Sequence, residues 1–273
     1  MWSNINKFGG IALTELVFIE GVSGVGKSTM AHTLTNELKS LGYAVKEYIE
    51  FDYTNPIDFY CTAYLSVEEY VELCEKHKSF IEILHVNTIV AGNVRLVRYY
   101  NQDTPLFNEP LLSELAQKEF CYNPIELVTR NEYTSVYINI WKSFVAAIDE
   151  TYDFIVFDGS LLHHPINDMM RNYNITGKQA ISHVTALLNA LGLRTWHIFY
   201  LRTNSIGEQL KKARLNRGQK TPTKEQINFW ETRYKNDMMV LNNIQKDCQV
   251  YDVSDDGWKL AREQILTNLL NHC

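Results

Sequence analysis

The 273-residue sequence has no excess of positive charge, with 26 Lys and Arg against 32 Asp and Glu and a formal net charge of −6. Because neutralising the phosphates of a duplex favours a basic protein surface, this balance argues against an extended nucleic-acid partner. Proline (6 residues) and glycine (13 residues) are scarce, while 45% of the residues are apolar. This composition excludes disordered, collagenous and coiled-coil proteins and indicates a globular chain with ample length to bury a core.

The sequence also has few cysteines and no long hydrophobic run. Its five cysteines are widely spaced and form no C-x-x-C pair, so we expect reduced thiols rather than a disulfide framework or a zinc ribbon. The most apolar stretch near the start, 11–20, is interrupted by Glu15 and is too short to span a bilayer. We therefore expect a cytoplasmic protein without a membrane partner.

Short apolar runs alternate with helical patterns along the chain, which is typical of a mostly parallel sheet covered by helices on both faces. The runs predict strands at 16–19, 44–50, 94–100, 154–157, 196–201 and 249–253. Helical spacing predicts helices at 27–39, 67–78, 80–90, 124–150, 178–191, 223–246 and 258–270. No segment break divides the chain convincingly, so we expect one domain over residues 1–273.

The strongest signal is a glycine-rich run that matches G-x-x-x-x-G-K-[ST] in full and lies between a predicted strand and a predicted helix. Glycines allow a tight turn in which several backbone N–H groups point at one anion. The positive end of the following helix dipole adds to this attraction. The run, which we call the glycine loop, consists of Gly21, Val22, Ser23, Gly24, Val25, Gly26, Lys27, Ser28 and Thr29.

This pattern predicts a phosphate-binding loop for a nucleoside triphosphate. Lys27 is expected to reach the β- and γ-phosphates, and the Ser28 hydroxyl is expected to bind Mg²⁺. A second metal ligand should end a later strand, and Asp158 closes the apolar run 154–157. The alternative for Asp158 is to cap the turn that follows. An incidental glycine turn is the alternative for the loop, and the full match in its strand-to-helix context disfavours it.

On these residues the sequence resembles the P-loop kinases of small molecules, with deoxynucleoside kinases and thymidylate kinases as the nearest comparison. The likeness depends on the glycine loop, on Asp158-Gly159-Ser160 and on the basic run 211–217, which are spread over most of the chain. It implies a three-layer P-loop NTPase sandwich whose five-stranded parallel sheet has the order 2-3-1-4-5. It also implies a mobile basic lid. The chain departs from the family pattern at Gly159, where these kinases usually carry an arginine.

The basic segment 202–224 is the expected lid. It contains seven basic residues and one acidic residue, a local charge of +6 in a chain of net −6. Lys211, Arg214 and Arg217 recur every third residue and share one helix face, which would repel itself unless it met phosphate or carboxylate. Arg214 and Arg217 are the expected phosphate contacts, since guanidinium can donate two hydrogen bonds to phosphate. A solvated charged helix is the alternative.

The resemblance also places the phosphoryl acceptor, within a substrate-side helical region at about 51–150. In deoxynucleoside kinases a carboxylate just after the second strand acts as the base, and here that region offers Glu50, favoured as strand-terminal, or Asp52. Solvated strand-end acids are the alternative for both. The nearby Phe51 and Tyr53 are expected either to stack on a planar ring or to join the core.

Two further places in the chain are candidates for contact with the acceptor. Arg130 and Tyr133 lie on the long predicted helix that faces the acceptor in the resembled kinases, which makes them expected substrate contacts. The adjacent pair His163-His164 follows the strand that ends at Asp158. Because neighbouring histidines do not share a helix face, we expect this pair in a surface turn.

Taken together, the residues predict an ATP- and Mg²⁺-dependent phosphotransferase. It would move the γ-phosphoryl group to a hydroxyl or phosphate of a small molecule, with a nucleoside- or nucleotide-like acceptor favoured. GTP as the donor and a homodimer remain open. The alternatives are a kinase acting on a polynucleotide end or a protein target, and a non-enzymatic nucleotide-binding or switch module. The guanine-reading N-K-x-D signature of small GTPases is missing from the sequence.

Overall fold

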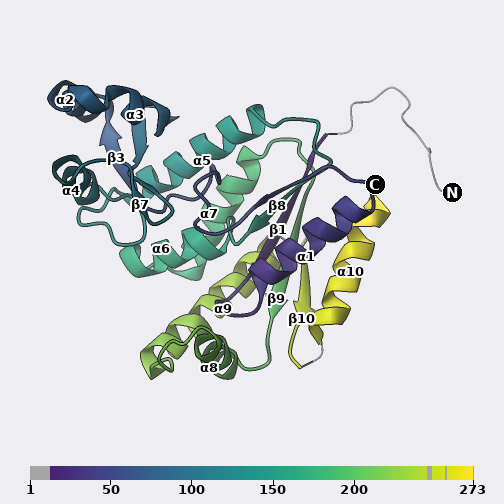
Figure 1. The fold of residues 1–273 in the computed structure, drawn as a ribbon. Helices are drawn as coiled ribbons and strands as arrows, with labels where there is room; N and C mark the ends of the chain where they lie inside the picture. Colours follow the sequence, from purple (N-terminus) through teal and green to yellow (C-terminus); the bar gives the residue numbers. More distant parts are fainter. Residues whose placement is uncertain (1–12, 245–247, 256, 273) are drawn as a thin grey trace.

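At the centre of the computed structural model, which describes residues 13–244, 248–255 and 257–272, lies a sheet of five parallel strands. The strands are β1 (Glu15–Gly21), β2 (Val45–Tyr48), β8 (Phe154–Asp158), β9 (Trp196–Arg202) and β10 (Cys248–Asp252). Their order across the sheet is β10–β9–β1–β8–β2, so β1 occupies the middle (Figure 1). The α/β class and the five-stranded parallel sheet expected from the sequence are confirmed.

Helices cover both faces of this sheet and make three layers (Figure 1). On one face lie α5 (Arg130–Ala146), α7 (Gly177–Ala190) and α9 (Lys224–Ile244), and on the other α1 (Lys27–Ser40) and α10 (Gly257–His272). Successive side chains of a strand point to opposite faces. Phe18 of β1 accordingly packs edge-on against Trp141 of α5, while Val17 and Ile19 belong to the core under α1. No helix in the described part of the chain is both long and apolar enough to cross a membrane.

A second body of structure, which we call the accessory lobe (residues 62–117), projects from the α5 side of the sheet (Figure 1). Three antiparallel strands form its sheet, in the order β3 (Thr62–Ser66), β5 (Val94–Arg98), β4 (Thr88–Ala91). The lobe also contains α2 (Val67–Lys76), the 3₁₀ helix η1 (Lys78–Phe80), α3 (Ile81–Val86), the hairpin β6 (Tyr100–Asn101) and β7 (Thr104–Pro105), and α4 (Glu109–Gln117). Its side chains form a separate apolar core. The expectation of a helical region at 51–150 is therefore wrong for this part.

Several predicted boundaries also move. The helix expected at 124–150 begins only at Arg130, because Thr129 and Glu132 form a capping box there. The helix expected at 80–90 ends at Val86, and the chain turns into β4. The helix expected at 223–246 is α9, and the last two residues of that prediction lie outside the described residues.

Two further helices surround the carboxyl edge of the central sheet. The sequence did not predict α6 (His163–Tyr173), which follows β8. Its first turn has no side-chain cap of its own; instead the buried carboxylate of Glu20 accepts the N–H groups of Leu161, Leu162 and His163. The basic segment contains α8 (Ile206–Asn216), which starts after the Ser205 cap and packs against α9. Both helices border the glycine loop, since His163 of α6 contacts the Gly21 carbonyl and Gln209 of α8 donates to the Gly24 carbonyl.

Candidate functional site

The glycine loop joins the middle strand β1 to α1, at the carboxyl edge of the sheet. Gly24 and Gly26 have φ angles of +84° and +96°, in the region that favours glycine. A Cβ on Gly24 would lie 2.7 Å from the Cβ of Ala213, so α8 packs directly on the loop. Open parallel sheets bind their ligands at this edge, and a helix N-terminus there presents unpaired N–H groups to anions.

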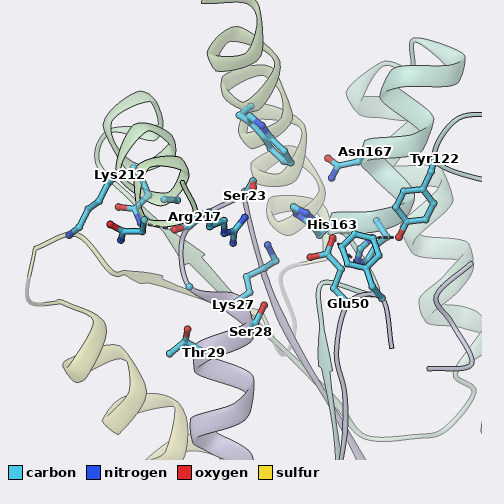
Figure 2. Close-up of a pocket in the computed structure, with 18 of the residues that line it drawn as sticks. Ser23, Lys27, Ser28, Thr29, Glu50, Tyr122, His163, Asn167, Lys212 and Arg217 are labelled. Carbon is cyan, nitrogen blue, oxygen red and sulfur yellow. Dashed lines mark hydrogen bonds and ion pairs between the residues drawn. The ribbon is translucent and has the colours of Figure 1, made fainter. Parts of the chain in front are cut away.

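Lys27 is the first residue of α1, and its side chain extends into the space above the loop (Figure 2). Its Nζ donates to the carbonyl of Val22 at 3.4 Å, and the residue is 7% exposed. One long hydrogen bond leaves most of the donor capacity of an ammonium group unused. The position therefore suits an anion held between Lys27 and the loop amides.

Ser28 and Asp158 lie side by side although 130 residues separate them in the chain. The Ser28 hydroxyl donates to Asp158 Oδ2 at 2.5 Å. Asp158 Oδ1 is buried and has no hydrogen-bond partner among the described residues. Hydroxyl and carboxylate oxygens are the ligands that Mg²⁺ takes in phosphate sites, and a buried carboxylate oxygen without a hydrogen-bond partner offers a free ligand position. The two side chains thus fit the metal pair expected from the sequence.

A cavity of about 530 Å³, which we call the main cavity, opens over the loop. Figure 2 shows Ser23, Lys27 and Ser28 between its two sides. On one side are Lys212 and Arg217 from the basic segment, and on the other are residues that follow β2 or belong to α6. The main cavity thus brings stretches that lie far apart in the chain to one place.

The basic segment contributes to the main cavity with only some of its charges. Arg217 lines it, as does Lys212, which the sequence did not single out. Arg214 lines an adjoining cavity of about 430 Å³, and its guanidinium donates to Gln226 Oε1 at 2.9 Å. Lys211 forms an exposed ion pair with Glu208 at 2.7 Å. Lys211, Arg214 and Arg217 therefore do not all face the main cavity as expected. Of the two arginines, Arg217 is the one that lines it.

On the opposite side, Glu50 and Phe51 follow β2 and line the main cavity. Phe51 is 46% exposed and has a φ of +60°, and its N–H donates to Asp58 Oδ2 at 2.7 Å. Asp52 points into a neighbouring hollow and accepts the N–H and hydroxyl of Thr54. Glu50 is thus the carboxylate of the pair that the structure places beside the glycine loop.

Three residues that were expected to contact the substrate are not among the residues that line the main cavity. Tyr53 donates its hydroxyl to Asn87 at the base of the accessory lobe. Arg130 is exposed at the first turn of α5. Tyr133 is fully buried in the core, where burial raises the pKa of its phenol, and its hydroxyl donates to Asp168 Oδ2 at 3.3 Å. Helical periodicity identified the buried face of α5 and not a substrate face.

The two histidines are buried at the start of α6, so the expectation of a surface turn is wrong. Gly159 allows this: its φ is +68°, and a Cβ there would lie 3.0 Å from the Cβ of His163 and 3.2 Å from Cε of Lys27. The ring of His163 stacks on Trp230 with centroids 5.4 Å apart, and its Nδ1 donates to the Gly21 carbonyl at 3.0 Å. Burial, aided by the charge of Lys27, lowers the pKa of His163, which keeps its ring neutral.

His164 joins a chain of hydrogen bonds at the opposite wall. Its Nδ1 lies 3.1 Å from the hydroxyl of Tyr122, which in turn donates to Asp58 Oδ1 at 3.1 Å. Its Nε2 lies 3.8 Å from Glu50 Oε1 and has no hydrogen-bond partner in the described ranges. Tyr122 and His164 both line the main cavity, and sequence reasoning missed Tyr122 entirely. It lies between the strand expected at 94–100 and the helix expected at 124–150, where the sequence predicted no element.

Further lining residues come from α6, which the sequence did not predict. Asn167, Asp168 and Arg171 recur on the face of this helix that borders the main cavity. Burial raises the pKa of Asp168, which accepts the Tyr122 N–H at 3.2 Å. A helical spacing search from 163 onward would have found this face, but the missing polar cap concealed the start of the helix.

Buried charges hold α6 and α9 against the glycine loop. Arg233 of α9 is fully buried, pairs with Asp237 at 2.8 Å and donates to the carbonyl of His163 at 3.0 Å. Glu20, one residue before the loop, accepts three N–H groups at the start of α6, and burial raises its pKa. Removing one partner from such a buried pair leaves an uncompensated charge. The network therefore fixes the wall of the main cavity.

Known protein-family models and curated protein sequences show no match to this chain. The assignment of the site therefore depends on the geometry and chemistry of its own residues. The structure defines an α/β protein with a cavity over a glycine loop at the carboxyl edge of its sheet.

Proposed function

We propose that this protein is an ATP- and Mg²⁺-dependent phosphotransferase with a small-molecule acceptor. One observation supports the proposal most: the glycine loop, the Ser28–Asp158 pair and Glu50 surround the same edge of the sheet, with the main cavity between them. A donor phosphate, a metal and an acceptor can meet there. Phosphoryl transfer needs mainly this kind of positioning and charge stabilisation.

The donor side has two further supports. Counted in chain order, the five central strands read 2-3-1-4-5 across the sheet, which is the order implied by the resemblance to P-loop kinases. The loop lies at the end of the middle strand, where its amides and Lys27 would hold the β- and γ-phosphates. ATP is the proposed donor, and GTP is the alternative donor.

Ser28 and Asp158 would hold the metal. Asp158 Oδ1, buried and unpaired among the described residues, offers the negative ligand, and the Ser28 hydroxyl lies beside Oδ2 of the same carboxylate. Bound Mg²⁺ would neutralise charge on the donor phosphates.

The basic segment would act as the lid. Lys212 and Arg217 line the main cavity opposite Glu50, and Gln209 of the same helix donates to the Gly24 carbonyl. A guanidinium that faces the transferring group stabilises its charge, and closure of the helix excludes water. Arg217 would therefore contact the transferring phosphoryl group, and Arg214, which donates to Gln226, would hold the basic segment together.

The acceptor would enter from the side of Glu50. Phe51 offers an exposed ring there, at a tilt to Tyr122 with centroids 5.9 Å apart, and flat rings of this kind stack on planar ligands. A nucleoside- or nucleotide-like acceptor is therefore favoured. Glu50, which lines the main cavity on this side, would lie near the reacting group of the acceptor.

The test is an ADP-release screen with MgATP across nucleosides, nucleotides, hydroxylated antibiotics, oligonucleotides and protein targets. We expect release that depends on a small molecule and on Mg²⁺. Release only with oligonucleotide ends or a protein would indicate the alternative kinases instead. Tight ATP binding with no acceptor-dependent release would indicate a non-enzymatic nucleotide-binding or switch module, and would overturn the proposal.

A further inference from the structure

The wall of the main cavity opposite the basic segment contains an imidazole whose Nδ1 is engaged in a hydrogen bond and whose Nε2 is buried without one. His164 is 8% exposed and lines the main cavity. Its Nε2 has no hydrogen-bond partner among the described residues, and the carboxylate of Glu50 is its near neighbour at 3.8 Å. A buried polar atom with no partner costs free energy unless a ligand completes it.

The hydrogen-bond chain behind His164 assigns its proton. The carboxylate of Asp58 accepts the N–H groups of Phe51 and Tyr60, so it is an acceptor for Tyr122 as well. A phenol has one proton, which Tyr122 donates to Asp58, and its oxygen must then accept from His164 Nδ1 at 3.1 Å. A ring that carries a single proton therefore holds it on Nδ1 and has a free electron pair on Nε2.

From this geometry we infer that His164 Nε2 is the proton acceptor of the reaction and that the acceptor substrate is a hydroxyl compound. The inference rests on the proposed phosphotransferase function. The acceptor O–H proton passes to Nε2 as its oxygen bonds to the γ-phosphorus. The bond from that phosphorus to the bridging oxygen breaks, and its electron pair leaves with ADP. The imidazolium returns its proton to solvent when products leave.

The surroundings suit this role. The imidazolium formed in the step would lie beside the Glu50 carboxylate, which stabilises its charge, while Nδ1–H keeps its bond to Tyr122. Glu50 is then the partner of the base rather than the base itself. An acceptor phosphate is already ionised and needs no proton acceptor, and it would be repelled by Glu50. The pair therefore selects a hydroxyl over a phosphate.

The first experiment needs no acceptor. Long-range ¹H–¹⁵N spectra of the imidazole nitrogens in the full chain at pH 8 should show His164 with its proton on Nδ1. The Tyr122→Phe variant removes the partner of that proton and should shift the ring toward the Nε2–H form. A wild-type ring with its proton on Nε2, or on both nitrogens, would overturn the assignment.

The second experiment compares variants with thymidine, and with thymidine monophosphate, as acceptors beside any hydroxyl compound found in the screen. We expect His164→Asn to lower kcat by about 10²–10⁴-fold with little change in KM, in the range of a lost general base. His164→Gly should regain activity with added imidazole. The control is His32→Asn, an exposed histidine on α1 that should keep wild-type turnover.

The outcomes separate the two proposals. Wild-type turnover that survives in His164→Asn, or preferential phosphorylation of the monophosphate, would overturn this inference and leave the phosphotransferase intact. Loss of turnover in Glu50→Gln that exceeds the loss in His164→Asn, without imidazole rescue, would return the base to Glu50. No release by the wild type with any acceptor would instead overturn the proposed function, while the ring spectra would still decide the tautomer.

Discussion

The glycine loop, which we call the donor side of the main cavity, and the wall opposite the basic segment, which we call the assembled side, are built in different ways. The donor side is one run of nine consecutive residues, Gly21 to Thr29, held by the strand before it and the helix after it. The opposite side draws Glu50, Tyr122 and His164 from three segments. A local motif needs only local folding, whereas an assembled wall needs the whole fold. A substitution on the donor side should therefore remove the contact of one residue. A substitution on the assembled side should also disturb the hydrogen bonds of the neighbouring residues.

The largest effect is expected on the donor side, from Lys27→Ala. The ammonium group is the charge closest to the loop, so its removal should lower phosphoryl transfer by at least about 10³-fold, the scale of a lost electrostatic clamp. ADP release under saturating MgATP is the measurement. Lys39→Ala, at the exposed end of the same helix, should leave transfer unchanged. Equal turnover in Lys27→Ala and the wild type would sink the proposed mechanism.

The next effect is expected from the metal pair. Asp158→Asn keeps the shape of the side chain and removes its charge, so we expect about a 10²-fold loss of turnover and a higher Mg²⁺ requirement. A titration of ADP release with Mg²⁺ measures both. An unchanged Mg²⁺ dependence would show that Asp158 only caps the turn that follows it.

A smaller effect should separate the two arginines of the basic segment. Arg217→Ala removes a charge that lines the main cavity, and we expect kcat to fall by about 10- to 100-fold. Arg214 donates to Gln226, so Arg214→Ala should change kcat by less than about threefold and loosen the segment instead. The kcat values of the two variants, with Lys211→Ala as the exposed control, are the measurement. Equal losses at 214 and 217 would contradict the division between the two cavities.

The smallest effect concerns stability on the assembled side. Burial raises the pKa of Glu119, three residues before Tyr122, to about 8. Between about pH 4.5 and pH 8 the unfolded chain releases this proton and the folded chain retains it, so the free energy of unfolding falls as pH rises. In the Glu119→Gln variant, the fall in the free energy of unfolding over this pH range should be smaller by about 2 kcal/mol than in the wild type, allowing for partial solvent screening.

Denaturant unfolding at pH 5 and pH 8 measures this difference. The matched control is Glu68→Gln, on the exposed face of α2, which should keep the wild-type decline. A Glu119→Gln variant that loses stability between pH 5 and pH 8 as steeply as the wild type would show that the carboxyl of Glu119 is not the group responsible.

Local signals predicted the donor side and much of the fold. The apolar runs located β1, β8 and β9, since these strands are buried on both faces and need no polar alternation, whereas the edge strands β2 and β10 are only partly buried. Asp158 was found because it ends such a run. The partner of Ser28 could thus be named from the sequence, although only the folded chain brings the two oxygens within 2.5 Å.

The assembled side was predicted poorly, and the causes are physical. The start of α6 is capped by Glu20, more than 140 residues earlier, so no local cap marks it. Gly159 leaves room for His163, which a pattern search would place on the surface. The periodicity of α5 could not say whether Tyr133 faces substrate or core. In each case the deciding contact is distant in sequence.

Transfer of the γ-phosphoryl group itself tests the central claim most directly. Phosphorus NMR of a mixture of the protein, MgATP and a hydroxyl acceptor distinguishes a phosphorylated acceptor from free phosphate. The proposal predicts a phosphate ester that forms with the wild type and is absent with Lys27→Ala. ATP that binds tightly and stays intact with every hydroxyl and phosphate acceptor would contradict it.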